Sequence, residues 1–185
     1  MHKVFNCFGL SFAAAGIAIG VYLGGLQLAG NFHEVKAGEL YRSNQPSATQ
    51  IARYSGEYGI KTIINLRGSN EGDEWYQEEK TAADHLGLTH IDFPMSASKQ
   101  LTLAESNRLI EIMRDAPKPI LIHCRSGSDR TGLASVIYLN RIAGEDEDIA
   151  ENQLSIRYGH IGIPYLSGTY AMDETWSKLE TAFGI

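Results

Sequence analysis

The chain has 185 residues, of which 43% are hydrophobic and 21% are charged. This composition is that of one globular domain with a modest additional segment, and it excludes a collagen-like, low-complexity or disordered chain. The formal net charge of −6 argues against nucleic acid as a partner, because binding driven by phosphate neutralisation needs a basic face.

An uncharged apolar segment opens the chain. Residues 8–26 (FGLSFAAAGIAIGVYLGGL) follow the lone cation Lys3 and come close to the ~20 residues that a helix needs to cross a bilayer. We predict a membrane anchor within residues 1–30, with a cleaved signal peptide as the alternative. With Lys3 inside, the domain of residues 31–185 is expected to be periplasmic or otherwise extracytoplasmic.

Three glycines of this segment recur at every fourth position, at Gly16, Gly20 and Gly24. That small-xxx-small spacing permits close helix packing and hence dimerisation in a membrane. Glycine is also frequent in membrane helices without such a role, so both interpretations stay open.

Beyond the anchor, short β-branched runs alternate with amphipathic segments. Strands are predicted over 40–42 (at the sheet edge), 61–66, 88–93 and 119–123. Helices are predicted over 48–58 with Ser47 as cap, 73–86, from 102 with a Thr102/Glu105 capping box, 130–142, 147–156 and 172–183. Residues 30–38 are expected to be a linker and 157–164 an irregular loop. The alternation predicts an α/β fold, a central and mostly parallel sheet flanked by helices, whose ligand lies at the carboxyl ends of its strands.

The most informative segment is residues 123–132 (HCRSGSDRTG), which joins a predicted strand to a predicted helix. Such a strand, glycine-bearing loop and helix start aim backbone N–H groups at one point, where the helix dipole adds positive potential. A tetrahedral phosphate dianion fits such a pocket. Cys124 at its base is the expected nucleophile, held as a thiolate, and Arg130 is expected to bind two phosphate oxygens.

The other residues of the loop have expected roles as well. Thr131 either reaches the sulfur of Cys124 and favours thiolate departure, or it satisfies a helix-start amide. The alternative for the whole segment is a buried structural cysteine beside a helix cap, which the combination with Gly, Arg and Thr disfavours. The residues expected to bind or frame the substrate phosphate are His123, which orients the loop through backbone hydrogen bonds, Arg125, Ser126, Gly127 and Ser128.

The pattern His-Cys-x-x-Gly-x-x-Arg-Thr-Gly resembles the signature of protein tyrosine and dual-specificity phosphatases. Residues 40–46 (LYRSNQP) and 59–67 (GIKTIINLR) are similar to bacterial dual-specificity-like members, including periplasmic ones that act on phosphotyrosine. The resemblance spans roughly residues 40–160. It implies the cysteine-phosphatase fold and hydrolysis of phosphate monoesters through a phosphocysteine intermediate.

The proton donor for the leaving group departs from that family's pattern. The family usually carries an aspartate on the loop after the strand that here ends at Phe93, and this chain has Ser, Ala, Ser and Lys at 96–99. Asp129 resembles a variant with the acid inside the phosphate loop, although it could simply complement the helix dipole. Asp92 is the second candidate, and the absence of any side-chain acid is the third.

Residues outside the motif are expected to contribute less. Arg42 and Arg67 are predicted to hold the sheet edge rather than to bind phosphate. Tyr158, His160 and Tyr165 are expected either to line one wall of the site or to pack.

Three functions remain open from the sequence. The leading one is a membrane-anchored protein phosphatase for phosphotyrosine, with dual specificity as a variant. The second is a phosphoinositide, inositol phosphate or phospholipid phosphatase, and the third is a catalytically silent phosphate-binding module. No metal or cofactor is expected, because no cluster of His, Cys, Asp or Glu has ligand spacing.

Overall fold

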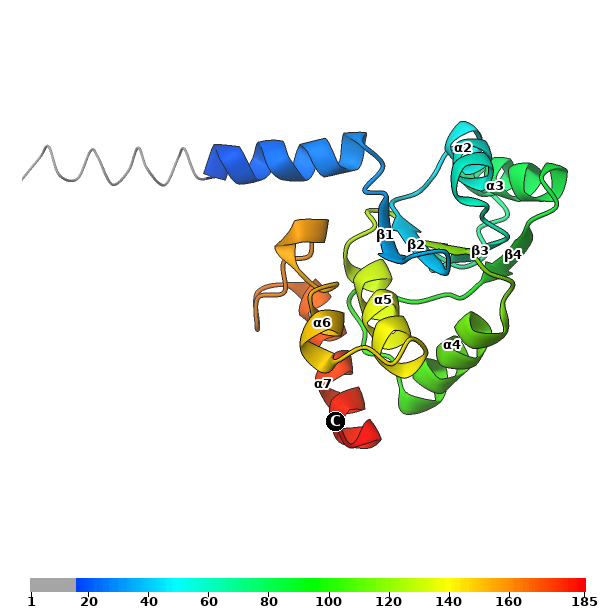
Figure 1. Ribbon diagram of the computed structural model, residues 1–185. Coiled ribbons are helices and arrows are strands. Elements are labelled where there is room, and N and C mark those ends of the chain that lie inside the picture. The colour runs from blue at the N-terminus through cyan, green and yellow to red at the C-terminus, as the bar shows by residue number, and fades with distance from the viewer. Residues whose placement is uncertain (1–15) are drawn as a thin grey trace, which may run out of the picture.

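The computed structural model describes residues 16–185, and in this part of the chain one mixed sheet is flanked by helices (Figure 1). The strands are β1 (His33–Lys36), β2 (Leu40–Ser43), β3 (Thr62–Asn65), β4 (Thr89–Asp92) and β5 (Ile120–His123). The helices are α2 (Ala48–Tyr58), α3 (Glu74–His85), α4 (Leu103–Asp115), α5 (Asp129–Arg141), α6 (Glu147–Glu151) and α7 (Ala171–Phe183). Residues 16–28 form a further helix ahead of β1, and the 3-10 turns are η1 (Ile156–Tyr158) and η2 (Gly168–Tyr170).

The sheet order is β1-β2-β5-β3-β4, and all neighbouring pairs are parallel except β1 with β2. This confirms the α/β class and the mostly parallel sheet. β5 lies in the middle, and its last residue, His123, pairs with Ser43 of β2 and Asn65 of β3. The carboxyl ends of three strands therefore meet where the motif begins, which is the usual ligand position in such sheets.

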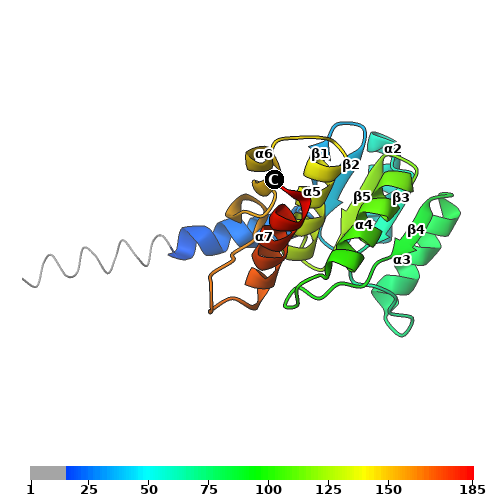
Figure 2. The ribbon, with the colours of Figure 1, turned by 90° about the horizontal axis from the view of Figure 1, so that it is seen from below.

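Alternate residues of the strands face opposite layers of helices. Ile64 and Ile122 face the core shared with α4, α5 and α7, whereas Ile63 and Leu121 face the side of α2 and α3. Figures 1 and 2 show α2 and α3 together on one side, with α4, α5 and α7 on the other. Both faces of β5 are thus covered, which explains why its sequence is apolar without alternation.

The helix starts follow the predicted capping residues. Thr102 and Glu105 form the predicted capping box of α4, and Ser47 forms one with Gln50 at α2. Each box satisfies two helix-start or flanking N–H groups that lack an intrahelical partner.

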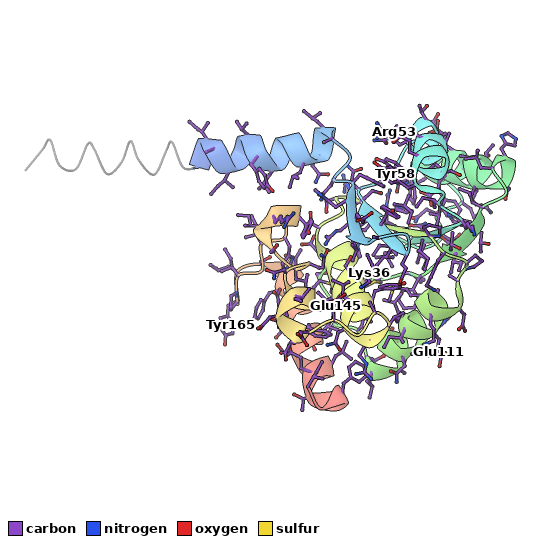
Figure 3. The ribbon with its side chains drawn as sticks, viewed as in Figure 1. Lys36, Arg53, Tyr58, Glu111, Glu145 and Tyr165 are labelled. Atoms are coloured by element: carbon purple, nitrogen blue, oxygen red, sulfur yellow. The ribbon has the colours of Figure 1, made fainter. Side chains whose placement is uncertain are left out.

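The edge of the sheet differs from the prediction. Residues 40–42 belong to the second strand, which is fully buried, and the edge strand is β1, within the segment predicted as a linker. β1 has only four residues (HEVK) and is half exposed, so its sequence lacks the apolar run of a buried strand. Lys36 of this edge forms an ion pair with Glu145, 2.5 Å away, just beyond α5 (Figure 3).

The predicted helix over 147–156 is also wrong in length. α6 ends at Glu151, and the chain then turns so that Gln153 faces the interior. The interior position of Gln153 is used by the candidate active site, described below.

The predicted anchor lies only partly within the described residues. No helix in residues 16–185 combines the length and the apolar character of a membrane span, and residues 8–15 lie outside the described part. The second half of the predicted span contacts the domain of residues 31–185, where the Tyr22 hydroxyl donates to Arg157 O at 2.7 Å. Gly16, Gly20 and Gly24 have no neighbour within 4 Å of the Cβ position, so dimerisation stays a prediction.

Candidate active site

Cys124 lies at the start of a tight loop between β5 and α5. Its side chain is 1% exposed, and the Gly127 N–H points at the thiol with an N···Sγ distance of 3.3 Å. α5 begins at Asp129, so the positive end of its dipole is directed at the same place. These features are the predicted strand, loop and helix start.

Gly127 is at a position where only glycine fits. Its φ is +73°, and an added Cβ would lie 2.7 Å from both Ser43 C and Asn44 N. The loop therefore rests directly on the backbone at the end of β2, which fixes its height above the sheet.

A fully buried arginine holds the loop from below. The Nη2 of Arg42 donates to Gly127 O at 2.8 Å and Ser128 O at 3.2 Å, and its Nη1 donates to the backbone and side-chain oxygens of Gln153 at 2.9 and 2.8 Å. The guanidinium also lies 4.2 Å from the centre of the Tyr158 ring. Burial lowers the pKa of Arg42 to about 10, against the opposing effects of Tyr158 and of Cys124 and Asp129. Arg42 is thus a structural residue, as the sequence favoured, although its partners are the loop and not the sheet edge.

Arg130 is fixed by one end of its guanidinium and free at the other. Its Nη1 donates to Leu66 O and Met95 O, both at 3.3 Å. Nε is buried without a partner, and Nη2 has no hydrogen bond within residues 16–185. The Nε/Nη2 edge is the one with which arginine binds two oxygens of an oxyanion.

Two further arginines gather near Arg130. Burial, followed by the charges of Arg130 and Arg125, lowers the pKa of Arg67. Arg67 donates to Gln45 Oε1 at 2.7 Å and lies 3.4 Å from the centre of the Trp75 ring. The fold therefore concentrates positive charge around the loop. In the sequence, only Arg125 and Arg130 place positive charge within the loop itself, and the fold adds Arg67.

Asp129 is held by a buried histidine. Its Oδ1 is 2.8 Å from Nδ1 of His160, and the other ring nitrogen of His160 is 3.0 Å from Asp173 Oδ2. Hydrogen bonds and charges of the two carboxylates outweigh burial, which acts in the opposite direction, and raise the pKa of His160 to about 9. From the sequence, His160 was expected to line a wall of the site or to pack, and its contact with Asp129 was not predicted. The sequence around Asp173 gave no signal for a contact with His160.

Asp92, the alternative acid, is engaged elsewhere. Its two oxygens accept from Asn65 Nδ2 at 2.8 Å and from the Tyr76 hydroxyl. Asp92 ends β4, which is separated from β5 by β3. The geometry thus favours Asp129 over Asp92.

The loop over 96–99 follows β4 as predicted, and the carbonyl of Met95 just before it contacts Arg130.

The contacts of His123 differ from the predicted ones. It is fully buried, and its Nε2 lies 3.0 Å from Glu79 Oε1, whereas its Nδ1 has no partner in the described chain. Glu79 is itself fully buried and also lies 2.7 Å from His90 Nε2. His123 therefore braces the loop through a carboxylate and not through backbone groups, and its side chain is not open to substrate. Glu79 carries no signal in the sequence, because a glutamate in a helix is usually solvated.

The remaining loop residues are placed as follows. Thr131 is fully buried and its hydroxyl forms no hydrogen bond in the described chain, so neither of its two predicted contacts is present. Arg125 is exposed beside the loop, and Ser128 is nearly buried. Ser126 turns its carbonyl toward the N-terminal segment, where it accepts from Gln27 Nε2 and Asn31 Nδ2, both at 3.0 Å.

The aromatic loop divides into packing and exposed residues. Tyr158 packs under Arg42, while Tyr165 is fully exposed and points away from the body of the domain (Figure 3). Neither is shown to line the site.

One cluster of carboxylates lies apart from this site. Ligand atoms of Glu147, Glu151 and Glu180 come within 4.8 Å of one another. Burial and the two neighbouring carboxylates raise the pKa of Glu180 to about 7. Exposed acidic groups of this kind are common without an ion.

The fold and the loop together point to a phosphatase domain. A model of the tyrosine phosphatase family matches residues 22–158, and the chain belongs to that family. A Cupriavidus necator protein named "Putative tyrosine-protein phosphatase" is 27% identical in an alignment of 161 residues that covers 71% of this chain and 58% of that protein. The chain thus spans less than two thirds of that relative's length.

Solved structures share the fold at low identity. A cysteine-to-serine variant of TpbA from P. aeruginosa, in complex with phosphotyrosine, is 21% identical, with a TM-score of 0.55 over 71% of this chain and 76% of that one. The core catalytic domain of the PP-IP phosphatase SIW14 from S. cerevisiae, in complex with citrate, is 22% identical, with a TM-score of 0.60 over 83% of this chain and 93% of that one. These structures support the fold.

Proposed function

We propose that the protein hydrolyses phosphate monoesters through a phosphocysteine intermediate and that phosphotyrosine in proteins is its preferred substrate. The observation that carries the proposal is the free Nε/Nη2 edge of Arg130, six residues after a buried Cys124 that already accepts an N–H from the loop. A buried guanidinium edge without a partner is costly unless an anion binds there.

The residues act in two steps. In the first, Sγ of Cys124 attacks phosphorus, the bond to the ester oxygen breaks, and the leaving oxygen takes a proton through Asp129. In the second, water attacks the phosphocysteine, the S–P bond breaks, and Asp129 accepts the water proton. Arg130 and the loop N–H groups bind the phosphoryl oxygens throughout.

Phosphotyrosine is favoured by family membership and by leaving-group chemistry. A phenol leaves more readily than an alkanol, so an acid at the edge of the loop suffices for it. The phosphotyrosine-bound TpbA structure adds support by similarity.

A second candidate is an inositol polyphosphate or pyrophosphate. It is favoured by the gathering of Arg67, Arg125 and Arg130 near one another and by the similarity to the PP-IP phosphatase SIW14. Several phosphate groups on one ring would use these charges better than one phosphotyrosine does.

The proposal is tested by turnover of the full chain on a phosphotyrosine peptide, a phosphoserine peptide, a phosphoinositide and an inositol pyrophosphate. We expect the highest kcat/KM on the phosphotyrosine peptide, complete loss in Cys124→Ser and a loss of about 10²–10⁴-fold in kcat in Asp129→Asn. Asp92→Asn serves as the matched aspartate control and should retain kcat if it folds.

Other outcomes select the alternatives. The highest kcat/KM on the inositol pyrophosphate or the lipid would replace the substrate assignment and keep the mechanism. Binding of all four without Cys124-dependent turnover would leave a silent phosphate-binding module.

The anchor in residues 8–26, with an extracytoplasmic domain, is kept as part of the proposal. Its support is the absence of charge over 19 consecutive residues. Membrane fractions of cells expressing the full chain should retain the protein after extraction at alkaline pH, and release of all of it would contradict the anchor.

A further inference from the structure

His160 is a buried imidazole that connects the catalytic loop to α7. Its side chain is 2% exposed, and its ring nitrogens lie 2.8 Å from Asp129 Oδ1 and 3.0 Å from Asp173 Oδ2. A neutral imidazole has one N–H and donates to only one of these carboxylates, whereas an imidazolium donates to both. The geometry therefore favours a protonated ring that is held in one orientation.

We propose that His160 is a positioning residue that orients Asp129 and supplies and recovers its proton during phosphoryl transfer. The inference rests on the proposed function, because it concerns the acid of that same site. Asp129 directly precedes Arg130 in the first turn of α5. Its Oδ1 is occupied by His160, and its Oδ2 forms no hydrogen bond within residues 16–185, so Oδ2 is available to the leaving oxygen.

The proton moves along the chain without any further reactant. When the Sγ–P bond forms and the P–O bond breaks, the Asp129 carboxylate takes the Nδ1 proton of His160 and passes one proton to the leaving oxygen, so that the ring becomes neutral and Asp129 is again a carboxylate. When water attacks the phosphocysteine and the S–P bond breaks, a water proton passes through Asp129 to Nδ1. The thiolate, the Asp129 carboxylate and the imidazolium are then restored, and inorganic phosphate leaves.

The charges around the ring suit this exchange. The groups that face His160 are Asp129 on α5 and Asp173 on α7, and the charge of the buried Arg42 also acts on Asp129. Burial would lower the pKa of His160, but the two carboxylates raise it to about 9. The ring thus carries a transferable proton at neutral pH, and its pKa is close to that of a phenol, about 10, which matches a phenolic leaving group.

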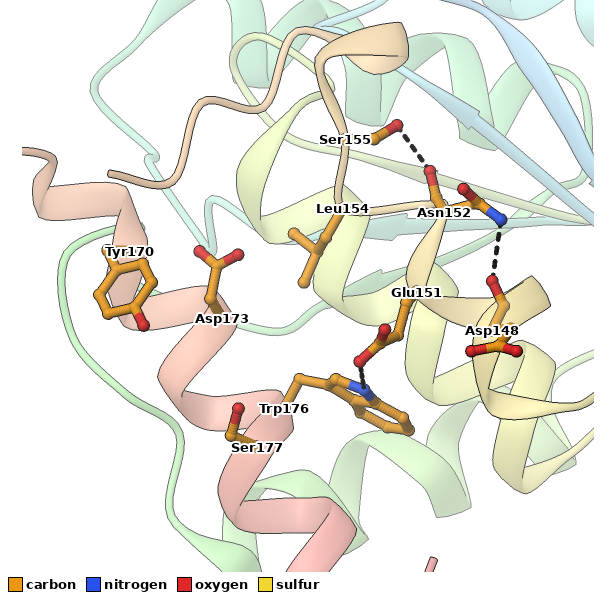
Figure 4. Close-up of a pocket in the computed structure, with 9 residues that line it drawn as sticks. All are labelled: Asp148, Glu151, Asn152, Leu154, Ser155, Tyr170, Asp173, Trp176 and Ser177. Atoms are coloured by element: carbon orange, nitrogen blue, oxygen red, sulfur yellow. Dashed lines mark hydrogen bonds between the residues drawn. The ribbon is translucent and has the colours of Figure 1, made fainter. Parts of the chain in front are cut away.

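The outer end of the chain reaches solvent. Asp173 has a side chain 30% exposed, and it lines a pocket between α6 and α7 together with Glu151, Tyr170 and Trp176 (Figure 4). The pocket does not include Cys124. On its other side, the carboxylate of Asp173 lies against Gly162. Asp173 is thus in contact with both His160 and solvent, and it can exchange protons with water.

The test measures kcat and KM of the full chain from pH 5 to pH 10 on phosphotyrosine and on p-nitrophenyl phosphate, a much better leaving group. His160→Gln should lower kcat on phosphotyrosine by about 10²-fold, with KM unchanged and a much smaller loss on p-nitrophenyl phosphate. In the wild type kcat should fall as the pH rises through about 9, where His160 loses its proton. Asp173→Asn should move this fall to lower pH. Glu174→Gln should match the wild type, because Glu174 is the adjacent exposed acid and, within residues 16–185, is bonded only to Gln100.

Results that would overturn the role of His160 can be told apart from results that would overturn the proposed phosphatase activity. Equal losses on both substrates, with an unchanged pH profile, would reduce His160 to a structural residue and overturn the inference alone. If His160→Gln does not fold, Asp173→Asn decides, and a pH profile identical to that of the wild type overturns the inference. Absence of Cys124-dependent turnover in the wild type would overturn both the proposed function and this inference.

Discussion

Arg42 shows how much of the catalytic loop depends on one side chain outside it. Its two terminal nitrogens bind four oxygens, two on the loop and two on Gln153. The forked, planar guanidinium is the only side-chain group that spans both sets, whereas an ammonium binds as a point charge.

Arg42→Lys should therefore lower the free energy of unfolding by about 2–3 kcal/mol, since buried acceptors lose their donors. It should also lower kcat, because Gly127 and Ser128 are no longer held. Urea unfolding and turnover check this prediction. Arg53→Lys, at an exposed site on α2, is the control, and equal behaviour of the two variants would contradict the role of Arg42.

Gly127→Ala tests the contact between the loop and β2. The new Cβ would lie 2.7 Å from backbone atoms that cannot yield, so the loop should shift and kcat/KM should fall by about 10²-fold, the cost of a displacement near 1 Å. Gly144→Ala is the matched control, because Gly144 has a similar positive φ of +69° but open space around it. Similar activity losses in both variants would show that backbone strain, and not the clash, is responsible.

At the scale of elements, the turn between the N-terminal helix and β1 belongs to the site. Asn31 is buried, has a positive φ of +44°, and donates to Ser126 O at 3.0 Å and Tyr158 O at 2.9 Å. It thus ties the turn to the loop and to η1 at once.

Asn31→Gly keeps the backbone conformation and removes these two bonds together with the contact of Asn31 Oδ1 with His33 Nε2 at 3.0 Å. We expect a loss of about 1–2 kcal/mol in unfolding free energy and a lower kcat/KM, measured by urea unfolding and initial rates. Asn152→Gly removes one exposed hydrogen bond at the end of α6 and should affect neither. If Asn31→Gly has wild-type kcat/KM, the turn at Asn31 does not support the active site.

The capping box of α4 is a purely structural element. Thr102→Ala should cost about 1 kcal/mol of stability and leave kcat/KM unchanged, because α4 contributes no residue to the loop. Thr181→Ala, whose hydroxyl donates only to Ser177 O within α7, should cost less than about 0.5 kcal/mol. A drop in kcat/KM in Thr102→Ala would mean that α4 acts on the site.

At the scale of the whole molecule, two buried groups set how stability depends on pH. The pKa of Glu79 is lowered from 4.5 to about 2, because His123, His90 and Gln45 outweigh burial, which raises it. A lowered carboxyl pKa gives stability that is present above 4.5 and is lost as the pH falls toward 2. The raised pKa of His160 gives stability that is present below 6.5 and is lost as the pH rises through about 9.

The stability that Glu79 and His160 contribute should therefore be highest between about pH 4.5 and 6.5, as measured by urea unfolding from pH 3 to 10. His160→Gln should remove the loss on the alkaline side and keep the acid side. If the loss of stability at alkaline pH is unchanged in that variant, groups other than His160 cause it.

Most of the architecture follows from local patterns. The runs at 61–66 and 119–123 are β-branched or apolar and bounded by Gly or Pro, and the boxes at Ser47 and Thr102 fix two helix starts. β1 could not be found in this way, because a four-residue, half-exposed edge strand has neither an apolar run nor clear alternation. Its pairing with β2 is decided by tertiary structure.

The candidate site is predictable only where its residues are contiguous. Cys124 and Arg130 belong to one loop and show themselves through their spacing. His160 contacts Asp129 from 31 residues further along the chain, Asp173 contacts His160 from 13 residues beyond it, and Glu79 contacts His123 from α3. Such partners become neighbours through packing, and no periodicity in one sequence encodes them.

The central place of β5 bears on how the protein is made on the ribosome. β5 is the last of the five described strands to be translated, yet it separates β2 from β3. Until residue 123 has emerged, the nascent chain presents two open strand edges with no strand between them, the kind of edge that recruits other chains. Gln153 must emerge later still before Arg42 has all its acceptors. The sheet and its loop are thus completed late in synthesis, and a chaperone that shields β2 and β3 until then would raise the yield of active protein.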